Sequence, residues 1–199
     1  MASKGLLVCL EGIDNAGKTA VARSVVRRLR SAGRPAQISK EFNTAIGKVL
    51  KESYLSASAE LKTLLFAADR IERQQRIIEP AIRSGTIVVA DRWTYSALAY
   101  RLAGTTPARR KRLRSYIDAV NRVCRVPDLV FYLDIPVSMS VARRQVDDPM
   151  PTEDVLKRVR VEYLKMRHRP IFEWVDATKP SDVVAQTVFE RVAEVAKLR

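Results

Sequence analysis

Gly12-Ile13-Asp14-Asn15-Ala16-Gly17-Lys18-Thr19 has the spacing G-x-x-x-x-G-K-[ST] of a phosphate-binding loop. An apolar run over residues 5–10 comes before it and predicts a buried strand, and residues 20–29 after it have a helical pattern. The motif requires both flanks, because the loop joins a strand to a helix whose N-terminus faces the phosphates. The sequence therefore predicts a nucleoside triphosphate site where the first strand ends.

The residue types of this loop suit an anion and its metal ion. Glycine at positions 12 and 17 lets consecutive backbone N–H groups point inward around phosphates. Lys18 can reach the β- and γ-phosphates, and the hydroxyl of Thr19 can hold Mg²⁺. We expect the following residues to bind ATP: Gly12, Asn15, Ala16, Gly17, Lys18, Thr19 and Ala20.

The length and composition indicate one globular domain over residues 1–199. Two cysteines, Cys9 and Cys124, are too few for a disulfide framework, which favours a reducing compartment. No stretch approaches the length of a membrane span, and the phosphate loop follows the N-terminus too closely for a cleaved leader. We therefore expect a cytoplasmic protein that does not associate with membranes.

The net charge of +14 allows two interpretations. Either the chain binds nucleic acid or another acidic surface, or its arginines hold anionic nucleotides and the surplus lies on solvated helix faces. The densest run, Arg109-Arg110-Lys111-Arg112, lies on an expected helix and has no interleaved aromatic residues. This pattern favours solvated faces, so we do not expect a nucleic-acid partner.

Strand and helix patterns alternate along the chain. The expected strands cover residues 5–11, 35–40, 86–90, 129–134 and 171–175. The expected helices cover residues 17–32, 44–54, 58–83, 95–101, 108–123, 136–144, 152–167 and 181 onward, with Pro80 kinking or dividing the third. This order predicts a three-layer α/β fold with a central parallel five-stranded sheet flanked by helices, and ligands at the carboxyl ends of the strands.

Asp91 and Arg92 follow the third expected strand directly. An Asp there can hold Mg²⁺ opposite Thr19, and an Arg beside it can grip a second anion with two hydrogen bonds. A simple ATPase needs the Asp but not the Arg, whereas a kinase whose acceptor is itself a phosphate needs both. The pair favours such a kinase, and the alternative is a surface ion pair at a strand end.

In these motifs the chain resembles the thymidylate kinases, nucleoside monophosphate kinases that phosphorylate dTMP. The matching stretches are residues 10–19, 65–70, 91–100 and 127–134, with a weaker match at Asp176-Ala177. They come in the family's order and cover nearly the whole chain. The resemblance implies a P-loop kinase fold, phosphoryl transfer from MgATP to dTMP, and a homodimer.

The resemblance also assigns the acceptor site. It implies that Asp14 turns to the 3′-hydroxyl, Phe66 stacks on thymine, Arg70 donates to thymine O4, Arg92 clamps the acceptor phosphate, and Tyr100 crowds the 2′ position. Phe66 and Arg70 are four residues apart, so both project from one face of a helix. Ser96 lies on the same helix face as Tyr100, where its hydroxyl either bonds the nucleotide or is structural.

The expected lid, residues 143–153, departs from the family. Members cover the transferring phosphate with an arginine in the phosphate loop or with arginines in a lid, and this loop has Asn15 instead. The candidates are Arg143 and Arg144, with Arg158 and Arg160 on the next helix as substitutes. We assign the ATP contact to Arg143, and we expect the catalytic residues to be Lys18, Arg92, Asp14 and Arg143.

Two other departures bear on the acceptor. The family's Arg-Glu-Pro turn is replaced by residues 40–44, K-E-F-N-T, and a glutamine that often follows the helix tyrosine is here Arg101. Both changes leave open a kinase with relaxed thymine selectivity, or one for another nucleotide or nucleoside. A nucleic-acid-associated ATPase and a catalytically idle regulator are the remaining alternatives.

Overall fold

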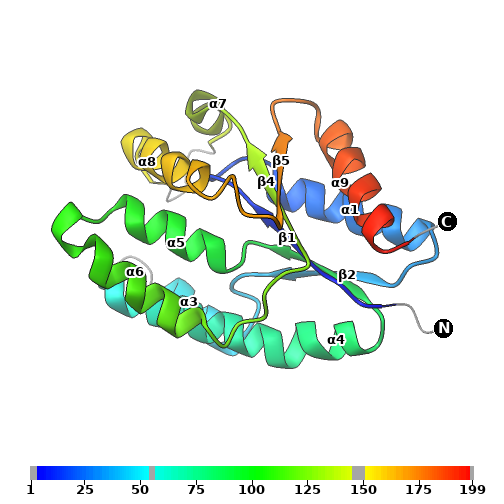
Figure 1. The fold of residues 1–199 in the computed structure, drawn as a ribbon, viewed down its shortest axis with the longest axis horizontal. Helices are drawn as coiled ribbons and strands as arrows, with labels where there is room; N and C mark the ends of the chain where they lie inside the picture. The colour runs from blue at the N-terminus through cyan, green and yellow to red at the C-terminus, as the bar shows by residue number, and fades with distance from the viewer. Residues whose placement is uncertain (1–3, 54–56, 145–150, 198–199) are drawn as a thin grey trace.

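The structure, a computed structural model, describes residues 4–53, 57–144 and 151–197. Within these residues five parallel strands form one sheet in the order β2-β3-β1-β4-β5 (Figure 1). The strands are β1 (Leu7–Glu11), β2 (Ala36–Lys40), β3 (Ile87–Asp91), β4 (Leu129–Asp134) and β5 (Phe172–Asp176). Every residue of β1 and β3 is buried, because helices cover both faces of a parallel sheet. The predicted three-layer α/β fold is confirmed.

Helices join the strands and cover both faces of the sheet. They are α1 (Lys18–Ser31), α2 (Ala45–Ser53), α3 (Ala59–Arg73), α4 (Glu79–Arg83), α5 (Thr94–Ala103), α6 (Pro107–Asn121), α7 (Val137–Ala142), α8 (Glu153–Leu164) and α9 (Ser181–Val195). Figure 1 shows α1 and α9 together on one side of the sheet, and α3, α4 and α5 on the other. In the described part of the chain, no helix is both long and apolar enough to cross a bilayer.

The expected helix over residues 58–83 is interrupted as Pro80 predicts, but one turn earlier than the proline itself. A π-helical segment, Gln74–Ile78, separates α3 from α4, and Pro80 lies in the first turn of α4. A proline has no N–H for the carbonyl four residues back, and its ring collides with that carbonyl. The wider turn before Pro80 accommodates this, because π-helical hydrogen bonds span five residues rather than four.

The register of the sheet brings the candidate residues to one edge. Leu10 of β1 pairs with Asp91 of β3, and Glu11 pairs with Tyr132 of β4. The loops that follow β1, β3 and β4 therefore leave the sheet at the same level. The phosphate loop lies in the middle, since β1 is the central strand of the order.

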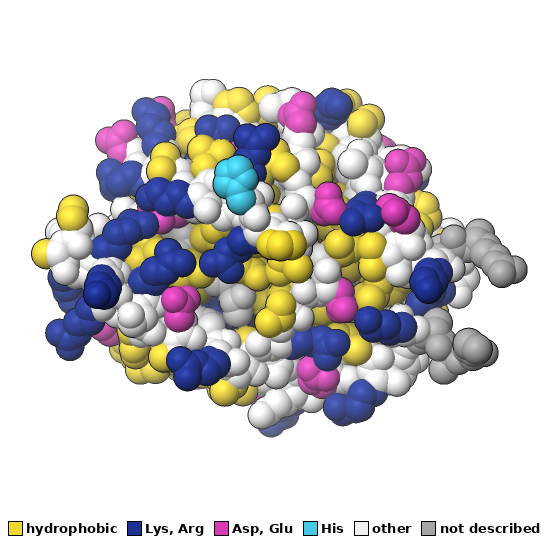
Figure 2. Space-filling view, in the orientation of Figure 1, with side chains coloured by type: hydrophobic (Ala, Val, Ile, Leu, Met, Phe, Trp, Pro, Cys, Tyr) yellow, Lys and Arg dark blue, Asp and Glu magenta, His cyan; other side chains and the backbone are white. Residues whose placement is uncertain are grey.

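Two members of the basic run on α6, and Arg114 just beyond it, are paired with acidic side chains. Arg109 meets Glu60 at 2.7 Å, Arg110 meets Glu162, and Arg114 meets Asp118 at 3.7 Å. Figure 2 shows Lys and Arg side chains dispersed over the visible face among acidic and apolar ones. This arrangement supports the interpretation of the run as a solvated helix face.

Candidate active site

The phosphate loop needs glycine at both of its glycine positions. Gly12 has φ 149° and Gly17 has φ 89°, backbone values that residues with a Cβ rarely adopt. A Cβ on Gly12 would also lie 2.7 Å from the carbonyl oxygen of Leu133. Asn15 has φ 56°, in the left-handed region that asparagine tolerates better than most residues. Ala16 is buried, whereas Ala20 is exposed in the first turn of α1.

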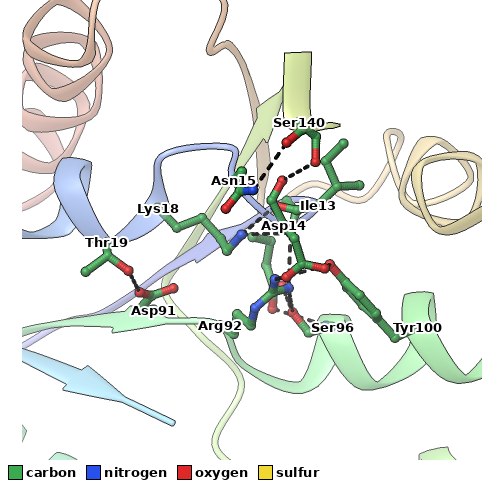
Figure 3. Close-up of polar contacts among 12 residues, drawn as sticks. Ile13, Asp14, Asn15, Lys18, Thr19, Asp91, Arg92, Ser96, Tyr100 and Ser140 are labelled. Atoms are coloured by element: carbon green, nitrogen blue, oxygen red, sulfur yellow. Dashed lines mark hydrogen bonds and ion pairs between the residues drawn. The ribbon is translucent and has the colours of Figure 1, made fainter. Parts of the chain in front are cut away.

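Lys18 lies under the loop with its ammonium group directed at two backbone carbonyls (Figure 3). Its Nζ donates to Gly12 O at 3.1 Å and to Ile13 O at 2.6 Å. Burial, and then the positive charge of Arg92, lower the pKa of Lys18 from 10.5 to about 8. The Lys18 ammonium group is therefore fixed beside the loop, where it can contact a phosphate bound there.

Thr19 and Asp91 form the candidate metal site. The Thr19 hydroxyl, in the first turn of α1, donates to Asp91 Oδ2 at the end of β3, at 2.5 Å. A hydroxyl and a carboxylate are hard oxygen ligands, and Mg²⁺ in phosphate sites takes few protein ligands because phosphates and waters supply the rest. This donor set therefore fits Mg²⁺.

Arg92 is the centre of a hydrogen-bonded cluster that unites three other candidate acceptor residues, Asp14, Ser96 and Tyr100. Its guanidinium donates to Gly12 O at 3.1 Å, Asp14 Oδ1 at 2.5 Å, Tyr100 Oη at 3.1 Å and Ser96 Oγ at 3.4 Å. Tyr100 also donates to Asp14 Oδ2 at 2.8 Å. Arg92 itself has φ 68°, a strained backbone conformation for a residue with a side chain. Figure 3 shows these side chains converging beneath the loop.

The cluster keeps Asp14 ionised. Burial alone would raise the pKa of this carboxyl, but the charges of Arg92 and Lys18, with the hydrogen bond from Tyr100, hold it below its usual range. Burial also raises the pKa of Tyr100, so its phenol remains a hydrogen-bond donor at neutral pH. The acceptor side of the site therefore combines a fixed cation with a fixed carboxylate.

The candidate base site lies between α3 and the segments beside it. Arg70 is buried, its Nε donates to Asn121 Oδ1 at 3.0 Å, and its Nη2 has no hydrogen-bond partner among the described residues. Phe66 is partly buried; its ring meets the ring of Phe42 edge-on at 5.9 Å, and the Arg101 guanidinium lies 5.2 Å from its centroid. Both residues assigned to the base are thus present on one helix, and Arg70 retains a free donor.

The turn that departs from the family takes part in this site. Phe42 has φ 66°, and its ring reaches Phe66. Glu41 beside it is buried, and burial raises the pKa of its carboxyl. A Cβ on Gly47 would lie 2.6 Å from Phe42 Cα, so α2 packs directly against the turn.

Helix α7 supports the loop from the other side. Ser140 Oγ donates to Asp14 O at 2.7 Å, and Asn15 Nδ2 donates to Ser140 O at 3.2 Å. Arg143, which caps the C-terminus of α7, donates to Asn15 O at 3.2 Å. A cavity of about 230 Å³ opens between the loop, Arg143 and the residues that lead into α9, among them Ala177.

The other candidate lid arginines are engaged elsewhere. Arg160 forms two hydrogen bonds with Asp134, at 2.7 and 2.8 Å, and Arg158 donates to Ala103 O at 3.0 Å. Arg144 is exposed, and the remainder of the expected lid up to Met150 lies outside the described residues. Arg143 is therefore the lid arginine that we assign to the phosphate loop, on its hydrogen bond to Asn15 O.

Comparison with known proteins settles the family. The family model described as thymidylate kinase matches residues 10–188. The probable thymidylate kinase of Thermococcus gammatolerans is 38% identical over 81% of this chain and 83% of its own length, and that of Thermococcus onnurineus is 36% identical over 82% and 85%. The chain belongs to the thymidylate kinase family. The thymidylate kinase of Thermomicrobium roseum, 35% identical, matches 96% of this chain and 95% of its own length.

Family membership confirms the resemblance that carries the acceptor assignments, while the roles of single residues stay predictions. Sequence patterns do not point to Glu11 or Ser140. Glu11 is fully buried at the end of β1, where its one visible signal is an acidic residue closing an otherwise apolar strand. Ser140 gives no signal in the sequence, because it reaches the loop from a helix 126 residues away.

Proposed function

We propose that this chain transfers the γ-phosphoryl group of MgATP to dTMP, giving ADP and dTDP. One observation carries the proposal: Lys18 Nζ and Arg92 Nη1 both donate to Gly12 O, each at 3.1 Å. Two cations, one from the triphosphate loop and one from the end of a neighbouring strand, therefore meet at one carbonyl. Such a pair can bring two anions together, whose mutual repulsion is the main obstacle to phosphoryl transfer between nucleotides.

Different residues are proposed to bind the phosphoryl donor, ATP, and the acceptor, dTMP. Lys18 and the loop N–H groups hold the donor phosphates, and Arg92 aligns the acceptor phosphate for in-line attack. That phosphate is already nucleophilic near neutral pH, so no strong general base is needed. Thr19 and Asp91 would hold Mg²⁺, which when bound neutralises charge on the donor phosphates.

Arg143 is proposed as the cation that covers the transferring phosphate. It adjoins the loop through Asn15 O and lines the 230 Å³ cavity on the donor side. This cavity, which is also lined by residues that lead into α9, is the proposed place of the ATP base and sugar.

Selectivity for dTMP is proposed to come from α3 and α5. Phe66 would stack on the base, and the free Nη2 of buried Arg70 would donate to thymine O4. Cytosine has an amino donor at that position and would leave Arg70 unsatisfied. Asp14 would accept from the 3′-hydroxyl, and Tyr100 would crowd a 2′-hydroxyl. Ser96 is proposed to be structural, since its hydroxyl is buried against Glu11.

A homodimer is proposed through the outer face of α2 and α3. Three large apolar side chains on these helices, Val49, Leu61 and Leu64, are about half exposed, at 52%, 46% and 48%. Apolar side chains gathered on neighbouring helices favour a protein contact. Light scattering of the protein and of a Leu64→Glu variant tests this: the variant should have half the mass of the parent.

The activity is tested by measuring ADP formation from ATP with each deoxynucleoside monophosphate in turn. We expect dTMP to be far better than dUMP, dCMP or dGMP. Strong turnover with another nucleotide would support the alternative kinase, and ADP formation that depends on DNA would support the ATPase.

A further inference from the structure

Glu11 accepts hydrogen bonds from three directions at a point where no solvent reaches it. Its side chain is 0% exposed and lies at the end of β1, immediately before the phosphate loop. Oε1 accepts from the backbone N–H of Trp93 at 2.9 Å and of Ser96 at 3.3 Å. Oε2 accepts from the hydroxyls of Ser96 and of Tyr163, the latter at 2.8 Å. One carboxylate therefore joins β1, the start of α5 and α8.

The two backbone contacts explain how Glu11 fixes the beginning of α5. The first N–H groups of a helix have no partner within the helix, and Trp93 and Ser96 are its N-cap and third residue. Trp93 offers no side-chain cap, so the carboxylate supplied by β1 takes that role. A negative charge at this position also interacts favourably with the positive end of the helix dipole, which stabilises the start of α5. Arg92, with its strained φ, is the residue just before this anchored turn.

The two hydroxyl contacts extend the anchor to the guanidinium. The Ser96 hydroxyl donates its proton to Glu11, so the Ser96 oxygen can only accept hydrogen bonds from its other neighbours. Arg92 Nη1 donates to that oxygen at 3.4 Å. Tyr163 also gives its proton to Glu11 Oε2, so the two hydroxyls lie side by side on one carboxylate oxygen, 2.9 Å apart. The guanidinium is thus connected to the buried carboxylate through one serine.

We propose that Glu11 and Tyr163 are positioning residues for Arg92, which they hold, through Ser96 and the first turn of α5, in the orientation that receives the acceptor phosphate. This inference rests on the proposed function for the identity of the acceptor. A purely structural role would also explain a buried carboxylate, but it would change stability without changing how tightly the folded protein binds the acceptor.

Three nearly isosteric variants separate these explanations. Tyr163→Phe removes the phenol that donates to Glu11. Glu11→Gln keeps an acceptor for the two backbone N–H groups and removes the charge. Tyr132→Phe is the matched control, because the Tyr132 ring packs on Tyr163 at 4.8 Å and its buried hydroxyl is not hydrogen-bonded to Glu11, Ser96 or Arg92.

The measurements are thermal stability, the Kd for dTMP by calorimetry, the KM for dTMP and for ATP, and a crystal structure of Tyr163→Phe beside the parent. We expect Tyr163→Phe and Glu11→Gln to raise the Kd and KM for dTMP about three- to tenfold with the KM for ATP unchanged, as loss of a hydrogen bond that orients a charged group implies. In the crystal structure of Tyr163→Phe, we expect Arg92 to leave Gly12 O. Tyr132→Phe should match the parent.

Parental Kd and KM values for dTMP in both test variants would overturn the proposal, even if both variants melt at lower temperature. An Arg92 guanidinium in the same place in both crystal structures would also overturn it, whatever the substrate. If the parent itself fails to phosphorylate dTMP, the proposed function fails, and the crystal comparison still decides whether Tyr163 orients Arg92. If one test variant does not fold, the Kd and KM values of the other decide between the two explanations.

Discussion

Arg92 and Arg143 approach the phosphate loop from two sides and are held very differently. Arg92 is only 15% exposed in its side chain, donates to four acceptors and stacks on the ring of Tyr100 at 4.9 Å. Arg143 is exposed at the end of a short helix and adjoins the loop through a hydrogen bond to Asn15 O. The arginine on the acceptor side is therefore fixed in advance, whereas the arginine on the donor side is lightly held.

The difference indicates how the two cations would act. A cation held by surrounding groups costs no reorganisation when charge develops, which is the most effective form of electrostatic stabilisation. A lightly held, exposed arginine must be ordered by the ligand, and the cost of ordering reduces what it contributes. We therefore expect loss of Arg92 to be the more damaging.

Arg92→Ala should lower kcat/KM for dTMP about a thousandfold or more, since one fixed donor to a reacting group is worth about 10²–10³ and Arg92 also orients the phosphate. Arg92→Lys should recover only a small part, because an ammonium group cannot form the paired hydrogen bonds of a guanidinium. Steady-state kinetics with dTMP varied measures both. Near-parental rates in Arg92→Ala would remove the assignment of the acceptor clamp.

Arg143→Ala should lower kcat about ten- to a hundredfold and leave the Kd for dTMP unchanged, because the residue faces the donor side. The matched control is Arg112→Ala, another exposed arginine, which lies on α6 outside the site. Turnover at saturating ATP and dTMP measures the effect. If Arg143→Ala behaves like Arg112→Ala, the covering cation comes from elsewhere in the chain.

The pH dependence tests the donor side through Lys18. Burial and Arg92 lower its pKa to about 8, so the free protein loses the ammonium charge as the pH rises through this value. We expect kcat/KM for ATP to fall about tenfold per pH unit above pH 8, since it reports groups of the free enzyme. Bound phosphates favour the charged lysine, so kcat at saturating ATP should stay flat to higher pH. A kcat/KM for ATP that stays level well above pH 8 would contradict this.

The same contrast explains what the sequence could predict. The loop, the strands beside it and Arg92 are predictable, because a contiguous motif and the ends of parallel strands determine their positions. Glu11 and Tyr163 meet across 152 positions of the chain, and no spacing rule relates them. The left-handed Phe42 and the contact of its ring with Phe66 arise from packing of α2 and α3, which the pattern of residues 40–44 does not encode.

Arg101 allows a test of base selectivity on the acceptor side, with the smallest expected effect. Its guanidinium lies 5.2 Å from the Phe66 centroid, next to the proposed base site. A guanidinium has only hydrogen-bond donors, so it can donate to N3 of cytosine but cannot accept from N3–H of thymine. A glutamine amide also has an acceptor, which can accept from thymine N3–H. Arg101→Gln should therefore raise the ratio of kcat/KM for dTMP over dCMP about threefold, which is the scale of one weak hydrogen bond. Arg101→Lys is the control that keeps the charge and the donor-only character, and it should leave the ratio unchanged. Equal ratios in all three proteins would show that Arg101 stands outside the reach of the base.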